Sequence, residues 1–281
     1  MNSVRNASTV ILLRDGKSGV EVFMLKRHLK SDFVGGAHVF PGGVLDPDDE
    51  VDERLCAGHT DESASAALGV ARGGLGYWVA AIRECFEESG VLLMYDAAGH
   101  ILDFGDPAIE KRYRDYREQL NQGRLSISDL ARREGLKLAT DRVHYWAHWI
   151  TPEGQPRRYD TRFFLTVAPR RQAAVHDGSE LTDSSWVTPQ EALEKARNKE
   201  WLVIFPTLRN LELLRDFGQT QDAEAVACAP RKILAIQPRV VRDQTGIRIL
   251  VPGDEGFEES IPAAASPAEI LQASLDRADD E

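Results

Sequence analysis

Residues 77–90 restrict the fold most strongly, because they combine a helical pattern with acidic residues on one side. At about 100° per residue, apolar and acidic side chains fall on opposite sides of such a helix. The apolar side carries Val79, Ile82 and Phe86, and the acidic side carries Glu84, Glu87 and Glu88. Gly90 favours a helix end, since glycine readily adopts a left-handed backbone conformation. The sequence therefore predicts a helix that presents three carboxylates together.

The three carboxylates would destabilise an isolated helix in two ways. Like charges repel one another at these spacings, and the acids lie in the last helical turns, where the helix dipole disfavours anions. A bound cation would reverse both effects, and carboxylate oxygens suit Mg²⁺, Mn²⁺ or Ca²⁺. The helix is thus predicted to form a metal site. The alternative is an exposed acidic helix flank that Arg83 partly neutralises.

Strand-like and helical segments alternate through the rest of the chain. The patterns predict strands at residues 8–14, 20–26, 91–94, 144–150, 161–168 and 184–187. They predict helices at residues 62–71, 77–88, 189–199 and 207–217, and further helices within 107–135. The first two strands are expected to form an antiparallel hairpin, because residues 15–19 are rich in turn formers.

The length of the chain bounds the domain count. A chain of 281 residues with 42% hydrophobic residues lies between one large elaborated domain and two ordinary ones. We favour a single domain over residues 1–260, with insertions at about 50–76 and 96–142. Residues 261–281 are expected to form a flexible tail.

Charge and cysteine usage exclude several classes of protein. The 34 basic and 45 acidic residues give a net charge of -11, which disfavours a nucleic acid polymer as partner. The three cysteines show no CxxC spacing, so neither a zinc site nor a disulfide framework is indicated. No apolar run approaches the roughly 18 residues that would span a bilayer. We therefore expect a cytoplasmic protein without a membrane segment.

Residues 83–91 resemble the second half of the box that defines the Nudix hydrolases, G-x5-E-x7-R-E-U-x-E-E-x-G-U, where U is a bulky aliphatic residue. Only Cys85, at the first U, departs from this half. The first half resembles residues 43–49, with Asp49 in place of glutamate, and 33 residues instead of seven separate Asp49 from Arg83. This interrupted box is similar to that of the branch that includes the peroxisomal coenzyme A diphosphatases. Three further segments resemble that branch, namely residues 38–43, 149–152 and 159–164.

The resemblance implies an α/β fold, the Nudix α/β/α sandwich with a mixed sheet and helical insertions. It implies a hydrolase that cleaves a diphosphate linkage with the help of Mg²⁺ or Mn²⁺. The implied metal ligands are Glu84, Glu87, Glu88 and the carbonyl group of Gly43.

The resemblance also implies roles for residues around the metal site. Arg83 would orient a carboxylate, for which Asp49 is the first choice and Asp48 or Glu50 the alternatives. Either Glu84 or Glu180 would accept the proton of the attacking water, and the sequence does not choose between them.

The substrate that the resemblance implies is coenzyme A, an acyl-coenzyme A or a related nucleoside diphosphate derivative. The element typical of coenzyme A-cleaving members is matched by Arg27, Gly36 and residues 40–43, whereas His28 and Asp32 depart from it. The predicted substrate contacts are Arg27, Gly42 and Arg162. Arg157 and Arg158 form a second cationic cluster beside Arg162, with surface ion pairs as their alternative role.

Two other functions stay open at this point. One is a nucleotide-sugar or dinucleotide pyrophosphatase, and the other is a non-catalytic Nudix domain that senses a nucleotide. The acidic helix argues against the sensor. A sensor needs no metal carboxylates, whereas this helix has all three although they repel one another in an empty site. The expected partner is a small diphosphate molecule, and no binding to a membrane is expected. The chain could also form a homodimer. Residues 278–281 lack a Ser-Lys-Leu type peroxisomal signal, so the location is expected to differ from that of the peroxisomal relatives.

Overall fold

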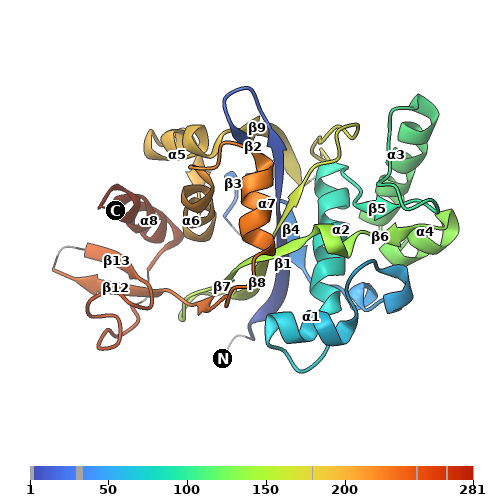
Figure 1. The fold of residues 1–281 in the computed structure, drawn as a ribbon. Coiled ribbons are helices and arrows are strands. Elements are labelled where there is room, and N and C mark those ends of the chain that lie inside the picture. The colour runs from blue at the N-terminus through green and yellow to red at the C-terminus, as the bar shows by residue number, and fades with distance from the viewer. Residues whose placement is uncertain (1–2, 30–33, 179, 245, 264, 281) are drawn as a thin grey trace.

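A mixed β-sheet runs through the middle of the molecule, with helices on both of its faces (Figure 1). The computed structural model describes residues 3–29, 34–178, 180–244, 246–263 and 265–280. Asp32 and Glu281, which entered the predictions above, lie outside these ranges.

Thirteen strands are present in the described residues. They are β1 (Arg5–Asp15), β2 (Val20–Arg27), β3 (Ala37–Val39), β4 (Gly42–Val44), β5 (Met94–Tyr95), β6 (Lys137–Leu138), β7 (His144–Ile150), β8 (Tyr159–Val167), β9 (Leu181–Val187), β10 (Leu202–Val203), β11 (Ala235–Ile236), β12 (Arg239–Asp243) and β13 (Gly246–Leu250). The helices are α1 (Asp61–Leu68), α2 (Leu75–Ser89), α3 (Pro107–Asn121), α4 (Ile127–Glu134), α5 (Pro189–Arg197), α6 (Phe205–Leu214), α7 (Thr220–Cys228) and α8 (Pro267–Asp280).

The main sheet is built around β1. Its strand order is β10-β3-β2-β1-β8-β7-β11, while β4 pairs with β1 and β9 pairs with β2. β1 is antiparallel to β2 and β4 but parallel to β8, so the sheet is mixed as predicted. The predicted hairpin of β1 and β2 is confirmed, with Leu13 opposite Val22.

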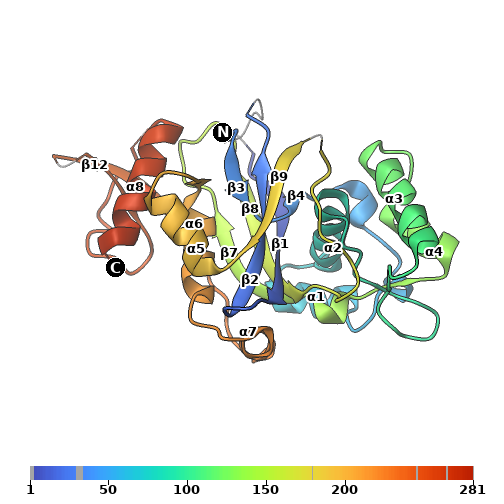
Figure 2. The ribbon, with the colours of Figure 1, turned by 90° about the horizontal axis from the view of Figure 1, so that it is seen from above.

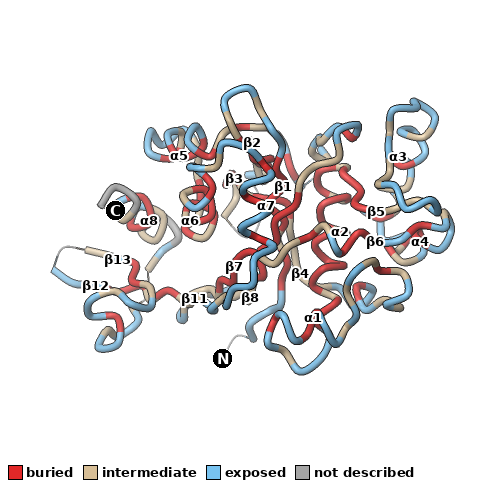
Figure 3. The backbone as a smooth tube through the Cα atoms, in the orientation of Figure 1, coloured by how far each residue is buried: buried red, intermediate tan, exposed pale blue. Residues whose placement is uncertain are grey.

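Strand alternation divides the interior into two hydrophobic cores. Val10 and Leu12 of β1 pack on the α2 side, whereas Ile11 and Leu13 pack on the side of α5, α6 and α7. Figure 2 shows these two helical layers on opposite sides of the sheet. Buried positions concentrate on α2 and the central strands (Figure 3). The α/β/α sandwich that the sequence predicts is therefore confirmed.

The predicted acidic helix is α2, and it is anchored to the sheet and to a neighbouring loop. Ser8 Oγ donates to the carbonyl oxygen of Tyr77 at 2.8 Å, and the indole nitrogen of Trp78 donates to the carbonyl oxygen of Val143 at 2.7 Å. Gly90 caps the helix with φ of 76°, the left-handed conformation expected of it. These contacts fix the rotation of α2, and with it the direction of its acidic face.

Both insertions contain helices on the α2 side of the sheet (Figure 1). The first contains α1, and the second contains α3 and α4. A strand predicted at residues 91–94 is wrong for its first three residues. The side chain of Gln172 hydrogen-bonds both the amide and the carbonyl group of Leu92, at 2.7 and 3.0 Å, and so takes the place of a neighbouring strand.

The flexible tail predicted for residues 261–281 is also wrong, because most of it forms α8. This helix packs against β13 and α6, with Ala273, Ser274 and Leu275 buried. Arg277 donates to the carbonyl oxygen of Ile249 at 2.9 Å and holds the helix to β13. Among the described residues, no helix has the length and apolar character needed to cross a membrane.

His38 gives the fold a testable dependence on pH. Its ring is buried and stacks on Trp201, with centroids 4.0 Å apart and planes 4° apart. Burial, helped by the charge of Lys26, lowers the pKa of His38 from 6.5 to about 4. A lowered histidine pKa gives a stability contribution that is present above about pH 6.5 and is lost as the pH falls towards 4.

Wild-type protein should therefore lose on the order of 2 kcal/mol more stability than His38→Phe between pH 7 and pH 4.5. Urea unfolding at the two pH values measures this difference. The exposed His100 supplies the control, since His100→Phe should follow the wild type. Equal losses in wild type and His38→Phe would show that His38 is not the group responsible.

Candidate active site

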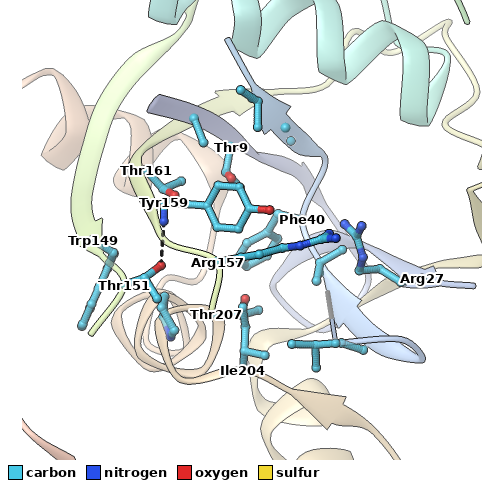
Figure 4. A pocket seen from close by; sticks show the side chains of 18 of the residues that line it. Thr9, Arg27, Phe40, Trp149, Thr151, Arg157, Tyr159, Thr161, Ile204 and Thr207 are labelled. Carbon is cyan, nitrogen blue, oxygen red and sulfur yellow. Dashed lines mark hydrogen bonds between the residues drawn. The ribbon is translucent and has the colours of Figure 1, made fainter. Parts of the chain in front are cut away.

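A cavity of about 1190 Å³ extends across the sheet from α2 to α8. It exceeds the volume of roughly 300–1,000 Å³ that is usual for sites of drug-sized ligands. Its walls come from β1, β4, β8, α2, α6 and α8, and from the loops after β2 and β7. Figure 4 shows side chains from several of these elements converging on the same space.

Arg83 organises the acidic end of the cavity. Its Nε and Nη2 donate to the two carboxylate oxygens of Asp49 at 2.8 and 2.9 Å, and Nη2 also donates to the carbonyl oxygen of Val44 at 3.1 Å. Its Nη1 donates to Glu84 and to Glu87, both at 2.8 Å. Although burial opposes the charged form, the hydrogen bonds with Asp49 hold the pKa of Arg83 above its usual range. One guanidinium group thus fixes three carboxylates.

Asp49 is the partner of Arg83, as predicted, although the insertion separates them in sequence. A short 3-10 turn over Pro47–Asp49 brings its carboxylate to α2. The same carboxylate accepts the amide of Asp46 at 2.7 Å in a capping box, so the turn itself holds Asp49 in place. Asp49 is 1% exposed, whereas the alternatives Asp48 and Glu50 are exposed.

The glutamates of α2 line one end of the cavity, where Glu84 and Glu88 are buried and Glu87 is half-buried. Burial, opposed in part by Arg83, raises the pKa of Glu84 to about 7. Burial and the neighbouring Glu84 raise the pKa of Glu88 well above its usual range. Burial also raises the pKa of Glu87. Negative charge at this position is therefore costly without a cation.

Two glycines let the backbone of β4 approach these carboxylates. The amide of Gly42 donates to Glu88 at 2.8 Å. At Gly43, an added Cβ atom would lie 2.3 Å from Oε1 of Glu84. Such a distance is shorter than any van der Waals contact, so a side chain at position 43 would force the carboxylate of Glu84 to move.

Gly43→Ala should therefore lower the turnover number at least about a hundredfold, because the new methyl group must displace Glu84. Steady-state hydrolysis assays with a diphosphate substrate measure this loss. Gly218→Ala is the matched control, since an added Cβ atom there meets nothing within 4 Å. An unimpaired Gly43→Ala enzyme would show that the contact with Glu84 has no functional importance.

The donor set at the acidic end fits a divalent cation. Carboxylate oxygens and a backbone carbonyl group are hard ligands, and the buried charges of Glu84 and Glu88 lack sufficient compensation from Arg83 alone. In the described part of the chain, no three His, Cys, Asp or Glu side chains form a ready-made metal centre. Glu84 and Glu87 are instead turned towards Arg83, and Glu88 towards Gly42.

Arg27 and Glu180 also reach this end of the cavity, as their predicted roles require. Both line it, and their charges act on Glu88 in opposite directions. Glu180 is exposed, and the carboxylate of Asp177 accepts the amides of Glu180 and Leu181 at 3.1 Å each.

Arg162 does not line the cavity, so its predicted substrate contact is wrong. Alternation along β8 places Arg162 on the α2 face of the sheet, together with Phe164, whereas Thr161 and Phe163 line the cavity on the other face. Its guanidinium group pairs with Asp160 and lies 4.9 Å from the ring centroid of Tyr77. Arg162 therefore belongs to the interior beside α2.

Arg157, unlike Arg162, lines the cavity. It lies in the loop between β7 and β8, and Figure 4 shows Arg157 and Arg27 pointing into the cavity. The sequence singled out Arg157 as part of a cationic cluster, but only the loop conformation aims it at the site.

The second insertion supplies contacts to α2 that the sequence did not indicate. Arg117 and Asn121 of α3 donate to the carbonyl oxygen of Glu87, at 2.9 and 3.3 Å. A cationic side chain at a helix C-terminus offsets the helix dipole, and Asn121 also lines the cavity. The sequence shows that α3 is rich in charged residues, but this does not predict which of them contact α2.

The acidic helix, the glycine strand beside it and the mixed sheet define the site and fold of a Nudix hydrolase. The family model of the NUDT19 Nudix domain matches residues 59–214, and the chain belongs to this family. Its members are diphosphatases that generally use divalent metal ions.

Proteins and a solved structure that resemble the chain support this assignment. The acyl-coenzyme A diphosphatases NUDT19 of Xenopus laevis and Homo sapiens are each 26% identical to it, over 283 and 275 residues. These matches cover 88% and 86% of the chain and 73% of each relative. The crystal structure of a NUDIX hydrolase from Alicyclobacillus acidocaldarius resembles this one with a TM-score of 0.68 and 26% sequence identity. The match covers 82% of this chain and 100% of that one.

Proposed function

We propose that the protein hydrolyses the diphosphate linkage of coenzyme A or an acyl-coenzyme A and releases two phosphate monoesters. One observation carries this proposal: a single cavity contains the acidic face of α2 together with Arg27 and Arg157. The acidic face suits the cations that accompany a diphosphate, and the arginines suit an additional phosphate group on the same molecule. The names of the NUDT19 relatives support the same substrate class.

The residues of the site have separate tasks in this reaction. Glu84, Glu87 and Glu88, with the carbonyl group of Gly43, would hold Mg²⁺ or Mn²⁺. These ions, when bound, lower the pKa of water and neutralise charge on the phosphoryl oxygens. Arg83, itself held by Asp49, fixes the direction of Glu84 and Glu87.

A carboxylate accepts the proton of the attacking water as a phosphorus–oxygen bond of the anhydride breaks. Glu84 and Glu180 both line the cavity and are the two candidates for this base. Comparison of Glu84→Gln with Glu180→Gln separates them. The true base gives the larger loss of turnover number, and restoring activity at higher pH marks a base rather than a structural group.

A substrate panel tests the proposed function. Purified protein is incubated with coenzyme A, an acyl-coenzyme A, ADP-ribose, NADH and UDP-glucose, with Mg²⁺, with Mn²⁺ and with chelator, and the products are identified. We expect metal-dependent cleavage of coenzyme A or its thioester in preference to the others. Preferred cleavage of UDP-glucose, NADH or ADP-ribose would establish a different pyrophosphatase, and no turnover of any compound would favour a nucleotide-binding sensor.

Arg157→Ala should raise KM for coenzyme A substrates about tenfold with a smaller change in kcat. The reason is that Arg157 contacts a part of the substrate remote from the broken bond, so it contributes equally to binding in ground state and transition state. Initial-rate kinetics measure both constants. Arg170→Ala, at an exposed position outside the cavity lining, is the control. An unchanged KM in Arg157→Ala would remove Arg157 from the binding site.

A further inference from the structure

The end of the cavity farthest from α2 differs in character from the acidic end. Figures 1 and 2 place α8 and α2 on opposite sides of the sheet. The lining residues contributed by β7, α6, β13 and α8 are mainly apolar, with Thr207 and Ser274 as the polar ones. The apolar ones include Trp149, Phe205, Ile249, Ile270 and Leu271. These five apolar residues form the apolar wall of the cavity.

The apolar wall is a built part of the fold. Trp149 and Phe205 pack edge to face with centroids 5.6 Å apart, and both are 5% exposed. Ile249 of β13 is 4% exposed. On α8, Ser274 Oγ donates to the carbonyl oxygen of Ile270 at 2.7 Å, so its hydroxyl proton is not available to a ligand. This end therefore presents hydrocarbon surface to whatever occupies the cavity.

A diphosphate and its metal ions would occupy only the acidic end. The rest of a substrate that reaches the apolar wall must be long and must end in an apolar group, because burying a polar end against hydrocarbon is unfavourable. A fatty acyl chain satisfies both conditions. Trp149 Nε1, which has no hydrogen-bond partner in the described chain, would gain one from a thioester or amide carbonyl group that enters beside it.

We propose that the apolar wall binds the acyl chain of the substrate and that Leu271 of α8 sets the chain length that the enzyme prefers. This inference rests on the proposed function, since it places the acyl chain relative to the diphosphate. It assigns the C-terminal segment, outside the matched residues 59–214, to substrate selection.

Chain-length profiles test this assignment. We expect kcat/KM of the wild type to rise from coenzyme A to hexanoyl- and decanoyl-coenzyme A, by up to roughly fourfold per methylene group buried. Leu271→Trp should fill the cavity and lower the ratio of the decanoyl-coenzyme A value to the coenzyme A value at least tenfold. Gln272→Trp is the matched control, because Gln272 is the exposed neighbour on the same helix and should keep the wild-type ratio. An unchanged ratio in Leu271→Trp would overturn the proposal.

A binding measurement separates this inference from the proposed function. Bromodecanoyl-pantetheine lacks the diphosphate but carries a quencher on its acyl chain. It should quench the tryptophan fluorescence of the wild type, and Trp149→Phe should show less quenching. Quenching without turnover of any coenzyme A compound would support the acyl-chain site and contradict the proposed hydrolysis. Turnover of coenzyme A, with no quenching and with kcat/KM independent of chain length, would support the proposed hydrolysis and contradict the acyl-chain site.

Discussion

Replacing Glu88 by glutamine is expected to lower kcat about a thousandfold while the protein stays folded. Glutamine keeps the length of the side chain and an oxygen that can accept the amide of Gly42, which now bonds Glu88 at 2.8 Å. It removes one negative charge from the proposed metal site, where charge stabilisation makes large contributions to the rate. Hydrolysis assays at saturating Mg²⁺ measure the loss. Glu62→Gln, at an exposed position of α1, should keep the wild-type rate.

The stability of the Glu88→Gln variant in chelator is the second measurement. Because the pKa of Glu88 is raised in the folded state, its ionisation is unfavourable there, and its stability contribution is lost as the pH rises above the ordinary value of 4.5. Glutamine removes this penalty, so the variant should be at least as stable as the wild type without metal. Its advantage should grow from pH 5 to pH 8. A wild-type rate, or a strong loss of stability at pH 8, would contradict the metal-site assignment.

Local patterns predicted the parts of the fold that depend on local interactions. The period of α2, the turn between β1 and β2 and the glycine at position 90 each determine structure over a few residues. Residues 91–93 failed this test because their backbone groups find partners outside a strand ladder. Both backbone groups of Leu92 bond the side chain of Gln172, 80 positions away, and the carbonyl group of Leu93 accepts the amide of Ala139. No local pattern indicates such a partner.

Tertiary contacts decide which residues reach the cavity. Alternation along β8 places Arg162 on the same face as Phe164, but it does not show that the cavity is lined by the opposite face of this strand. Arg157 precedes the strand, so periodicity says nothing about its direction. The C-terminal helix was missed for a similar reason. Its apolar residues are buried by contacts with β13 and α6, which the local sequence pattern does not predict.

Asp49 shows the opposite case, in which the sequence identified a long-range contact. The family spacing assigned the carboxylate to Arg83 although 33 residues intervene. The structure explains why aspartate is long enough at this position. The 3-10 turn and its capping box bring the backbone of Asp49 close to α2, so the shorter side chain still reaches Nε and Nη2 of the guanidinium group.

Asp49→Ala is therefore expected to lose about 3–5 kcal/mol of stability, with a fall in melting temperature on the order of 10 °C, and most of its activity. The substitution leaves the buried charge of Arg83 without its bidentate partner and removes the acceptor that closes the capping box. Urea unfolding and hydrolysis assays measure the two effects. Asp48→Ala, at the exposed neighbouring position, should change both only slightly.

The Asp49 effect can be separated into the ion pair and the turn. In a double-mutant cycle with Arg83→Met, the coupling energy between Asp49 and Arg83 reports the pair alone. We expect a coupling of about 2 kcal/mol or more, because both groups are shielded from solvent and share two hydrogen bonds. A coupling near zero would mean that Asp49 acts only on its own turn. In that case Glu84 and Glu87 would not depend on Asp49 for their position, and Asp49→Ala would retain its activity once the loss of stability is compensated by lower temperature.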